Sequence, residues 1–222
     1  MEINLEFKNK LESYRTEFEE RLKRYVGSLG GIDAKLKESA DYSLFSGGKR
    51  IRPIIMLAFC DLFGGNRENV YPFACALEMM HTYSLIHDDL PCMDNDTMRR
   101  GKPCNHIKFG EDIALLAGDG LLTQAFEAVS DFETDDKLNK NRIRSIKILA
   151  ECAGMSGMIS GQCMDLRINA DNISVDKVLE LYRLKTAKLF CAASEIGALM
   201  SGAGQDEADL TKEYGERIGI VF

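Results

Sequence analysis

The 222-residue sequence has little of what would place it in a membrane, in a secretory pathway or on nucleic acid. No apolar run approaches the roughly 18 residues of a membrane span. The N-terminus, MEINLEFKNKLE, is charged throughout and lacks the apolar core of a signal peptide. The net charge of −7 argues against a general nucleic-acid binder, whose surface would be basic. We therefore expect a cytoplasmic protein with no membrane span and no nucleic-acid partner.

The sequence also lacks C-x-x-C pairs, although it contains seven cysteines. An odd number of cysteines, several within apolar runs, indicates reduced thiols in a cytosolic protein. The spacings of the candidate zinc ligands fit none of the common structural zinc sites. These candidates are His81, His87, Cys92, Cys104 and His106. Neither a disulfide framework nor a structural zinc site is favoured.

Proline is scarce, with four residues and none after Pro103, and no segment alternates between polar and apolar residues. We therefore expect helices and no strands. One apolar face is formed by Leu11, Tyr14, Phe18, Leu22 and Val26, at helical spacing. A second helix, with Pro72 in its first turn, runs to the aspartates at 88–89. Helical periodicity recurs over 143–153 and over 178–192, the latter capped by Ser174 or Asp176. The predicted fold class is all-α, a single-domain helical bundle around a central cavity, where ligand sites are built from facing helices.

The stretch HTYSLIHDDLPCMDNDTMRRGKPCNH, residues 81–106, carries the strongest functional signal. Four aspartates, at 88, 89, 94 and 96, precede a compact basic group at 99, 100 and 102. Adjacent carboxylates repel one another, and at a helix C-terminus each opposes the helix dipole by roughly 0.3–1 kcal/mol. Mg²⁺ bound by carboxylates and substrate phosphate oxygens would relieve this repulsion. The pattern predicts a phosphorylated substrate that is held through metal.

Pro91 gives the acidic stretch its expected geometry. On an ideal helix Asp94 would lie about 240° around the axis from Asp88. Because Pro91 disfavours helix in the preceding residue, the backbone can fold Asp94 back toward Asp88. Two alternatives are a polar interhelical loop and a metal phosphohydrolase with a His-Asp doublet. Neither explains the neighbouring Arg-Arg-Gly.

Three further segments carry polar groups that could face a site. The loop GGKRIRP, residues 47–53, has three cations in four residues, which alone would be a solvated turn. Together with Arg99 and Arg100, it indicates a second diphosphate site.

Glycine costs about 1 kcal/mol against alanine inside a helix, so Gly154, Gly157 and Gly161 in one helical segment predict close packing. Gln162 and Asp165 could share a face of that segment. The pair Lys185-Thr186 would place a cation and a hydroxyl at a cavity wall.

Together, GGKRIRP (47–53), HTYSLIHDDLPCMDNDTMRRGKP (81–103), GQCMDL (161–166) and KTA (185–187) resemble the trans-isoprenyl diphosphate synthases, which make farnesyl or geranylgeranyl diphosphate. The resemblance covers almost the whole chain. It implies an all-α homodimer with a deep central cavity. Such an enzyme joins isopentenyl diphosphate head-to-tail to an allylic diphosphate (dimethylallyl or geranyl), with two or three Mg²⁺ ions bound alongside the substrate diphosphate.

The resemblance also implies a role for each matching position. Asp88, Asp89 and Asp94 would bind Mg²⁺. The allylic diphosphate would be contacted by Arg99 and Lys185, and the isopentenyl diphosphate would be held by Lys49, Arg52, His81 and Arg100. Gln162 and Thr186 would face the developing allylic cation, and Asp165 would orient neighbouring groups.

The product follows from the residues before the acidic stretch. Ser84 lies one turn before Asp88, and Tyr83 precedes it, so both would lie below the metal where the growing chain must extend. A bulky Tyr83 would form a floor for the cavity, which favours farnesyl diphosphate over geranylgeranyl diphosphate. Two other readings stay open, a class I terpene cyclase and a noncatalytic synthase subunit. A cyclase needs no second diphosphate site, so the basic residues 49, 52, 81 and 100 favour the synthase.

The family's second aspartate-rich motif would follow the predicted helix at 214–222, where this sequence stops. Asp206, Glu207 and Asp209 are interpreted as part of a polar interhelical loop that does not replace the motif. We therefore expect residues 1–222 to be a polyprenyl synthetase domain that lacks its C-terminal part.

Overall fold

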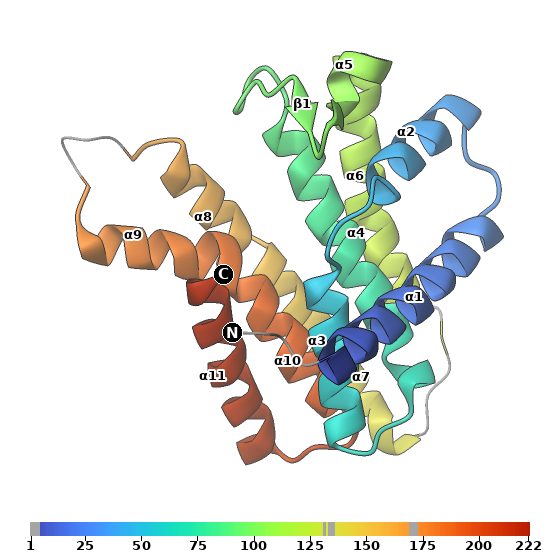
Figure 1. The fold of residues 1–222 in the computed structure, drawn as a ribbon, viewed down its shortest axis with the longest axis vertical. Helices are drawn as coiled ribbons and strands as arrows, with labels where there is room; N and C mark the ends of the chain where they lie inside the picture. Colours follow the sequence, from blue (N-terminus) through green and yellow to red (C-terminus); the bar gives the residue numbers. More distant parts are fainter. Residues whose placement is uncertain (1–4, 131, 133–135, 169–172) are drawn as a thin grey trace. The chain divides into compact units, whose positions relative to one another are not determined.

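The structure, a computed structural model, describes residues 5–130, 132, 136–168 and 173–222. It divides into two compact units, the first comprising Met1–Ile54 and Cys75–Asp131 and the second comprising Ile55–Ala74 and Phe132–Phe222. The described residues are mostly helical (Figure 1). The predicted all-α fold class is confirmed.

The first unit contains α1 (Leu5–Ser28), α2 (Ala34–Leu44), α5 (Asn105–Phe109) and α6 (Glu111–Ser130); α3 (Ile51–Leu62) and α4 (Tyr71–Asp88) have residues in both units. The predicted apolar face of α1 is confirmed, because Tyr14, Phe18, Leu22 and Val26 are buried. Asp33 caps α2 by accepting hydrogen bonds from the backbone N–H groups of Lys35 and Leu36. Both α2 and α5 pack against α6.

Helix α4 begins at Tyr71 with Pro72 in its first turn and ends at Asp88, as predicted. Residues 75–80 are all buried, and Glu78 is the charged residue among them. Its carboxylate accepts a hydrogen bond from Arg50 at 2.6 Å, and the Arg50 side chain is only 1% exposed. Arg50 also donates to the Leu44 carbonyl at 2.7 Å. One of the three cations of the 47–53 loop therefore pairs with a buried acid inside the fold.

A short antiparallel hairpin joins β1 (Met98–Arg99) to β2 (Lys102–Pro103). Arg100 and Gly101 form its turn, with φ of 52° and 75°. Positive φ at both turn residues is the pattern of a type I′ turn, whose twist suits a two-residue connection. The expectation of no strands is wrong at this point, because strands of two residues are too short to show an alternating pattern.

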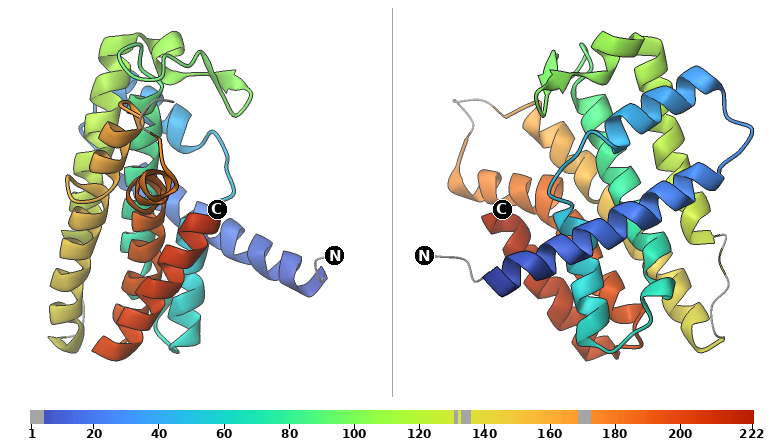
Figure 2. Two further views of the ribbon diagram at one scale, coloured as in Figure 1. Left: turned by 90° about the vertical axis from the view of Figure 1, so that its left-hand side faces the viewer. Right: turned by 45° about the vertical axis from the view of Figure 1, so that its right-hand side comes forward.

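The second unit contains α7 (Asp136–Ala153), α8 (Met158–Asp165), α9 (Val175–Tyr182), α10 (Lys188–Leu199), α11 (Gln205–Val221) and the 3₁₀ helix η1 (Arg67–Asn69). Every residue from Leu189 to Leu199 is buried, so α10 is the core helix of this unit. It packs against α7 and α11 (Figure 2). Ser174 caps α9 through a hydrogen bond from the Lys177 N–H, one of the two predicted caps.

The segment predicted as one helix over 178–192 is interrupted by a π-helical turn, η2 (Arg183–Ala187). The Lys188 N–H donates to the Arg183 carbonyl, five residues earlier. A single π turn adds one residue to the helix and shifts the apolar spacing by one position, which is too small a change to be recognised in the sequence pattern. Such turns are frequent at functional sites.

Two further expectations in this unit are wrong. Gly154 and Gly157 do not lie inside a helix with Gly161, because the chain turns between α7 and α8. A Cβ atom at Gly157 would lie 2.1 Å from the Cys152 carbonyl oxygen, so the turn requires glycine there.

Asp206, Glu207 and Asp209 do not form a loop, because they lie in the first turns of α11. Glu207 accepts a hydrogen bond from the Gly204 N–H at 2.8 Å, and acidic residues stabilise the N-terminus of a helix. Within the described ranges, none of the helices combines the length and the apolar character that crossing a membrane requires.

The Arg50–Glu78 pair gives a test of the first unit. Glu78→Ala would remove the buried acid and leave the Arg50 guanidinium with only the partly exposed Glu19 carboxylate at 3.4 Å, so we expect a loss of about 3–5 kcal/mol in the free energy of unfolding. Glu12→Ala, which removes the exposed partner of Arg15, serves as the control and should cost less than about 1 kcal/mol. Urea unfolding of both variants measures the difference. Equal losses would contradict the assigned role of the buried pair.

Candidate functional site

Acidic side chains collect at the C-terminal end of α4, where the chain turns at Pro91. The Asp94 N–H donates to the Asp88 carbonyl at 2.9 Å, so the loop folds back on the last residue of the helix. Asp88 is half-buried, and Asp94 is exposed. The predicted return of Asp94 toward Asp88 is confirmed for the backbone. We refer to Asp88, Asp89 and Asp94 as the acidic cluster.

Asp89 is paired with Arg99 of β1. The Arg99 Nε donates to the two carboxylate oxygens of Asp89 at 2.7 and 2.9 Å, and an Arg99 Nη2 contact lies at 2.5 Å. Asp89 is only 3% exposed. The hydrogen bond with Asp89 raises the pKa of Arg99. Asp89, a predicted metal ligand, and Arg99, a predicted diphosphate contact, therefore form an ion pair. The sequence does not predict this pairing.

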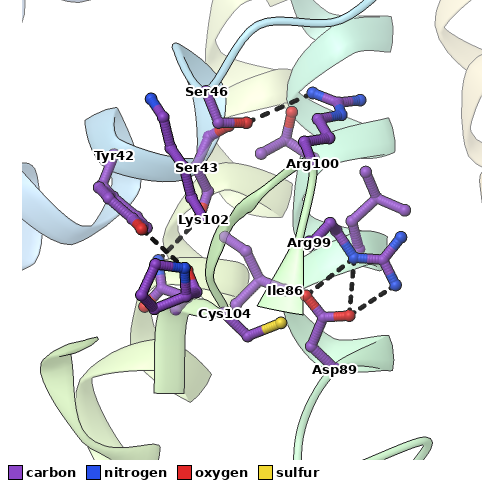
Figure 3. Close-up of a pocket in the computed structure, with 13 residues that line it drawn as sticks. Tyr42, Ser43, Ser46, Ile86, Asp89, Arg99, Arg100, Lys102 and Cys104 are labelled. Carbon is purple, nitrogen blue, oxygen red and sulfur yellow. Dashed lines mark hydrogen bonds and ion pairs between the residues drawn. The ribbon is translucent and has the colours of Figure 1, made fainter. Parts of the chain in front are cut away.

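A solvent-open pocket of about 370 Å³ lies beside this pair (Figure 3). The hairpin supplies Arg99, Arg100 and Lys102 to its wall. The remaining lining residues come from α2, α4 and α5 and from the segments that follow or precede them: Tyr42, Ser43, Ser46, Thr82, Leu85, Ile86, Asp89, Pro103, Cys104 and Asn105. Three cations therefore surround a pocket whose only acidic lining residue is already paired.

The two predicted basic segments meet at Arg100. Its guanidinium donates to the Gly47 carbonyl. It also donates, at 3.4 Å, to the Ser46 hydroxyl (Figure 3). Gly48 has a φ of 137°, and a Cβ atom there would lie 3.0 Å from the Arg100 guanidinium. Glycine at this position therefore leaves room for the arginine. Lys49, the next residue, is exposed.

Positive charge accumulates around this point. Burial is the main cause that lowers the pKa of Arg52 to about 10, and the charge of Arg100 lowers it further. The pKa of Arg100 is lowered by burial and by Arg50 and Arg99. Burial, followed by the nearby arginines, lowers the pKa of His81 well below its ordinary value, so its imidazole is neutral near pH 7. Like charges held together in this way would be stabilised by an anion.

Tyr83 and Ser84 lie on α4 before the acidic cluster. Tyr83 is buried, and its ring contacts the His87 ring edge-to-face at 5.7 Å. Its hydroxyl has no hydrogen-bond partner among the residues that the structure describes. Ser84 donates to the His81 carbonyl at 2.8 Å, so its hydroxyl is used within its own helix. Tyr83 is therefore a buried aromatic side chain of α4, and its role as the floor of a cavity stays a prediction.

The second unit holds the other predicted site residues. Lys185 and Thr186 lie in the π turn η2, and both are half-buried. Lys185 forms an ion pair with Asp165 of α8 at 2.5 Å, and Gln162 lies on the same helix. A Cβ atom at Gly161 would lie 2.3 Å from the Lys185 backbone nitrogen, so this glycine lets α8 pack against the π turn. Close packing is thus confirmed at Gly161, the one helical glycine of the three.

The donor atoms of the acidic cluster fit magnesium. Mg²⁺ prefers oxygen ligands and is usually held by one or two carboxylates together with waters and substrate phosphate. No group of three His, Cys, Asp or Glu side chains is positioned to bind a metal ion by itself in the part of the chain that the structure describes. Binding of Mg²⁺ by Asp88, Asp89 and Asp94 therefore stays a prediction.

Sequence reasoning missed several residues of the pocket, including Tyr42, Ser43, Ser46 and Cys104. Tyr42 donates to the Pro103 carbonyl at 2.8 Å, and Asn105 donates to the Ser43 hydroxyl at 2.8 Å. These residues are more than 50 positions apart along the chain. No spacing in the sequence predicts that these residues are neighbours in the fold. Asn105 is the one residue among them whose position, at the start of a helix, gives a signal in the sequence.

The chain matches the family model described as polyprenyl synthetase over residues 33–222. It is 41% identical to the farnesyl diphosphate synthase of Bacillus subtilis over 220 residues, which is 96% of this chain and 73% of that protein. It is 42% identical to a heterodimeric geranylgeranyl pyrophosphate synthase large subunit of Arabidopsis thaliana over 192 residues, covering 85% of this chain and 52% of the plant protein. The chain thus spans about half the length of that plant relative and about three quarters of the bacterial one.

Two solved structures have the same fold. A geranyltransferase from Legionella pneumophila matches with a TM-score of 0.89 at 33% identity, covering 96% of this chain and 76% of that one. An FPP/GFPP synthase from Zymomonas mobilis also matches with a TM-score of 0.89, at 35% identity, covering 98% of this chain and 78% of that one.

The lowered pKa of His81 predicts a dependence of stability on pH. Below the ordinary histidine pKa of about 6.5, the unfolded chain binds a proton that His81 in the folded chain does not, so stability falls as the pH falls through this range. His81→Gln removes this titration, and we expect the variant to lose less stability than the wild type between pH about 7.5 and about 5.5. Urea unfolding at both pH values measures this loss of stability. The other histidines are present in both proteins, so their titration does not contribute to the difference. A larger acid loss in the variant would overturn the assignment.

Proposed function

Since the chain belongs to the polyprenyl synthetase family, we propose that it is a magnesium-dependent prenyltransferase that condenses isopentenyl diphosphate with dimethylallyl or geranyl diphosphate to give farnesyl diphosphate. The observation that carries the proposal is the meeting of the acidic end of α4 with the arginines of the hairpin beside one pocket. Carboxylates for a cation and guanidinium groups for phosphate are what a diphosphate requires.

Each predicted residue has a place in this proposal. Asp88, Asp89 and Asp94 hold Mg²⁺ together with the allylic diphosphate, and the Asp89 carboxylate also holds Arg99. Arg99 and Lys185 contact the allylic diphosphate. The isopentenyl diphosphate lies against the basic group of Lys49, Arg52, His81 and Arg100. The positive charges crowded around Arg100 support the placement of the isopentenyl diphosphate there, because a bound anion reduces the repulsion between them.

The chemistry needs the negative charge of the departing diphosphate to be neutralised while the allylic carbon–oxygen bond breaks. Bound Mg²⁺ supplies Lewis-acid stabilisation of that charge. The arginines supply fixed positive charge that needs no reorganisation during the reaction. His81 is neutral near pH 7, so it contributes a hydrogen bond rather than charge. Gln162 and Thr186 present polar oxygens to the developing cation, and the released diphosphate takes the final proton.

Two products are compatible with the relatives, since some are named for farnesyl and others for geranylgeranyl diphosphate. We propose farnesyl diphosphate, with the buried Tyr83 ring as the side chain that would block extension past α4. We further propose that the protein is cytoplasmic and works as a homodimer, and that residues 1–222 represent one polyprenyl synthetase domain.

A subunit of a larger synthase is the second candidate, favoured by the plant relative that is named as the large subunit of a heterodimer. The purified protein would be incubated with Mg²⁺, labelled isopentenyl diphosphate and either dimethylallyl or geranyl diphosphate. Chain elongation supports the proposed function, and loss of diphosphate without elongation indicates a terpene cyclase. Elongation only after a second synthase chain is added indicates the subunit.

Removing the metal-binding oxygens gives a direct test. Asp88→Asn and Asp94→Asn each keep the side-chain size but remove a negative charge, and we expect kcat/KM to fall by about 10²–10³-fold. Excess Mg²⁺ should restore part of the loss. Asp209→Asn, on the exposed face of α11, is the matched control and should retain activity. A full loss in the control, or none at Asp88 and Asp94, would contradict the assignment.

Replacing the proposed floor tests product length. Tyr83→Ala removes the buried ring, so the allylic chain can extend further and longer products should appear. Gas chromatography of the dephosphorylated products measures the distribution, with Ser84→Ala as a control that removes only a hydroxyl already bonded within α4. Products no longer than those of the wild type would show that Tyr83 is not the floor.

A further inference from the structure

His87 connects two helices of the first unit, α4 and α6, immediately before the acidic cluster. It follows Tyr83 by four residues, so the two side chains lie on the same face of α4. Their rings meet edge-to-face, with centroids 5.7 Å apart and an interplanar angle of 77°. Aromatic pairs favour this geometry. His87 therefore contacts the side chain that we propose as the floor for the growing chain.

The His87 ring is anchored on α6. Its Nε2 atom donates to the Leu115 carbonyl at 3.0 Å, since a carbonyl oxygen can only accept. The imidazolium and the neutral ring protonated at Nε2 both carry the hydrogen atom that this bond needs, so the bond does not require a charged ring. The Asp119 carboxylate lies 3.8 Å from the same nitrogen. The ring is thus held by α6, although its backbone belongs to α4.

Gly118 leaves the space that the imidazole occupies. It is buried within α6, and glycine is among the least favourable residues inside a helix. A Cβ atom at this position would lie 2.1 Å from Nε2 and 2.4 Å from Cδ2 of His87. A Cβ atom at Gly120, on the same helix, would meet no neighbouring atom within 4 Å in the described part of the chain. Of these two glycines, Gly118 is the one whose missing side chain makes room for His87.

The Tyr83 ring has no polar anchor of its own. It is only 6% exposed, and its hydroxyl has no hydrogen-bond partner among the described residues. A buried tyrosine hydroxyl usually finds such a partner, which fixes the ring. Without that bond, the position of the Tyr83 ring depends on packing, and the anchored imidazole of His87 is an aromatic group that packs against it.

We propose that His87 is a positioning residue that sets product length, because its ring, anchored at Leu115 and Gly118, holds the Tyr83 ring in place. The inference rests on the proposed function, in which Tyr83 is the floor that stops chain growth. It assigns His87 no contact with metal or substrate, and it does not depend on the charge of the imidazole.

The distribution of products tests this role. His87→Ala removes the ring, and Gly118→Ala places a methyl group where the ring now lies, so the imidazole must leave the Leu115 carbonyl. The loss of one edge-to-face contact corresponds to a factor of about two to ten, and we expect each variant to raise the ratio of geranylgeranyl to farnesyl diphosphate by that factor. Gly120→Ala, the matched control on α6, should leave the ratio unchanged.

A double variant separates positioning of Tyr83 from an independent effect of His87. If His87 acts through Tyr83, the variant that carries both Tyr83→Ala and His87→Ala should give the same products as Tyr83→Ala alone. Further lengthening in the double variant contradicts the proposal. Wild-type products from both His87→Ala and Gly118→Ala, when Tyr83→Ala does lengthen the chain, also contradict it and leave the proposed function intact.

A second measurement needs no turnover. In protein with ring-labelled tyrosine, the NMR signal of Tyr83 is identified by its absence in Tyr83→Phe. Removal or displacement of the imidazole changes the ring current at Tyr83, so the signal should shift in His87→Ala and Gly118→Ala but not in Gly120→Ala. An unshifted signal in the first two variants overturns the proposal. If the wild type elongates no substrate, or if Tyr83→Ala does not lengthen the products, the proposed function fails in that respect, and the NMR signal still decides whether His87 positions Tyr83.

Discussion

The ion pair between Asp89 and Arg99 determines how the first unit presents its charged residues. Asp89 immediately follows the last residue of α4 and is nearly inaccessible to water, so its carboxylate must be compensated. Arg99 provides that compensation from the hairpin. The hairpin is consequently drawn against the end of α4, and its next residue, Arg100, reaches Gly47. One buried acid thus brings together two basic segments that are about 50 residues apart.

This arrangement holds several positively charged side chains close together, which lowers the stability of the folded protein. Arg52, Arg100 and His81 each have a lowered pKa, with burial as the main cause and neighbouring arginines adding to it. Such an arrangement disfavours the charged forms until an anion arrives. Arg50 differs, because Glu78 neutralises it within the fold. The basic loop therefore contains one arginine, Arg50, whose buried ion pair stabilises the protein, while Lys49 and Arg52 are the cations that we propose for the diphosphate.

Helix boundaries set by local signals could be predicted from the sequence. Pro72 and Pro91 marked the start and the end of α4, Ser174 marked the start of α9, and the return of Asp94 followed from the break at Pro91. Features that depend on distant contacts could not be predicted. The pairing of Asp89 with Arg99 and the pairing of Arg50 with Glu78 each join separate elements. The sequence does not separate a loop from a first helical turn at the acids of α11, because a run of acidic residues is compatible with both.

The π-helical turn at 183–187 has a consequence for how this protein tolerates change. A π turn accommodates one residue more than an α-helical turn, so η2 is equivalent to a single insertion within an otherwise continuous helix. Deleting any one of its five residues would let the backbone close into ordinary α-helix without breaking it. The residues on one side of the deletion would then rotate by about 100° relative to those on the other. A shortened chain could fold with all its hydrogen bonds intact and still present different side chains where Lys185 and Thr186 now lie.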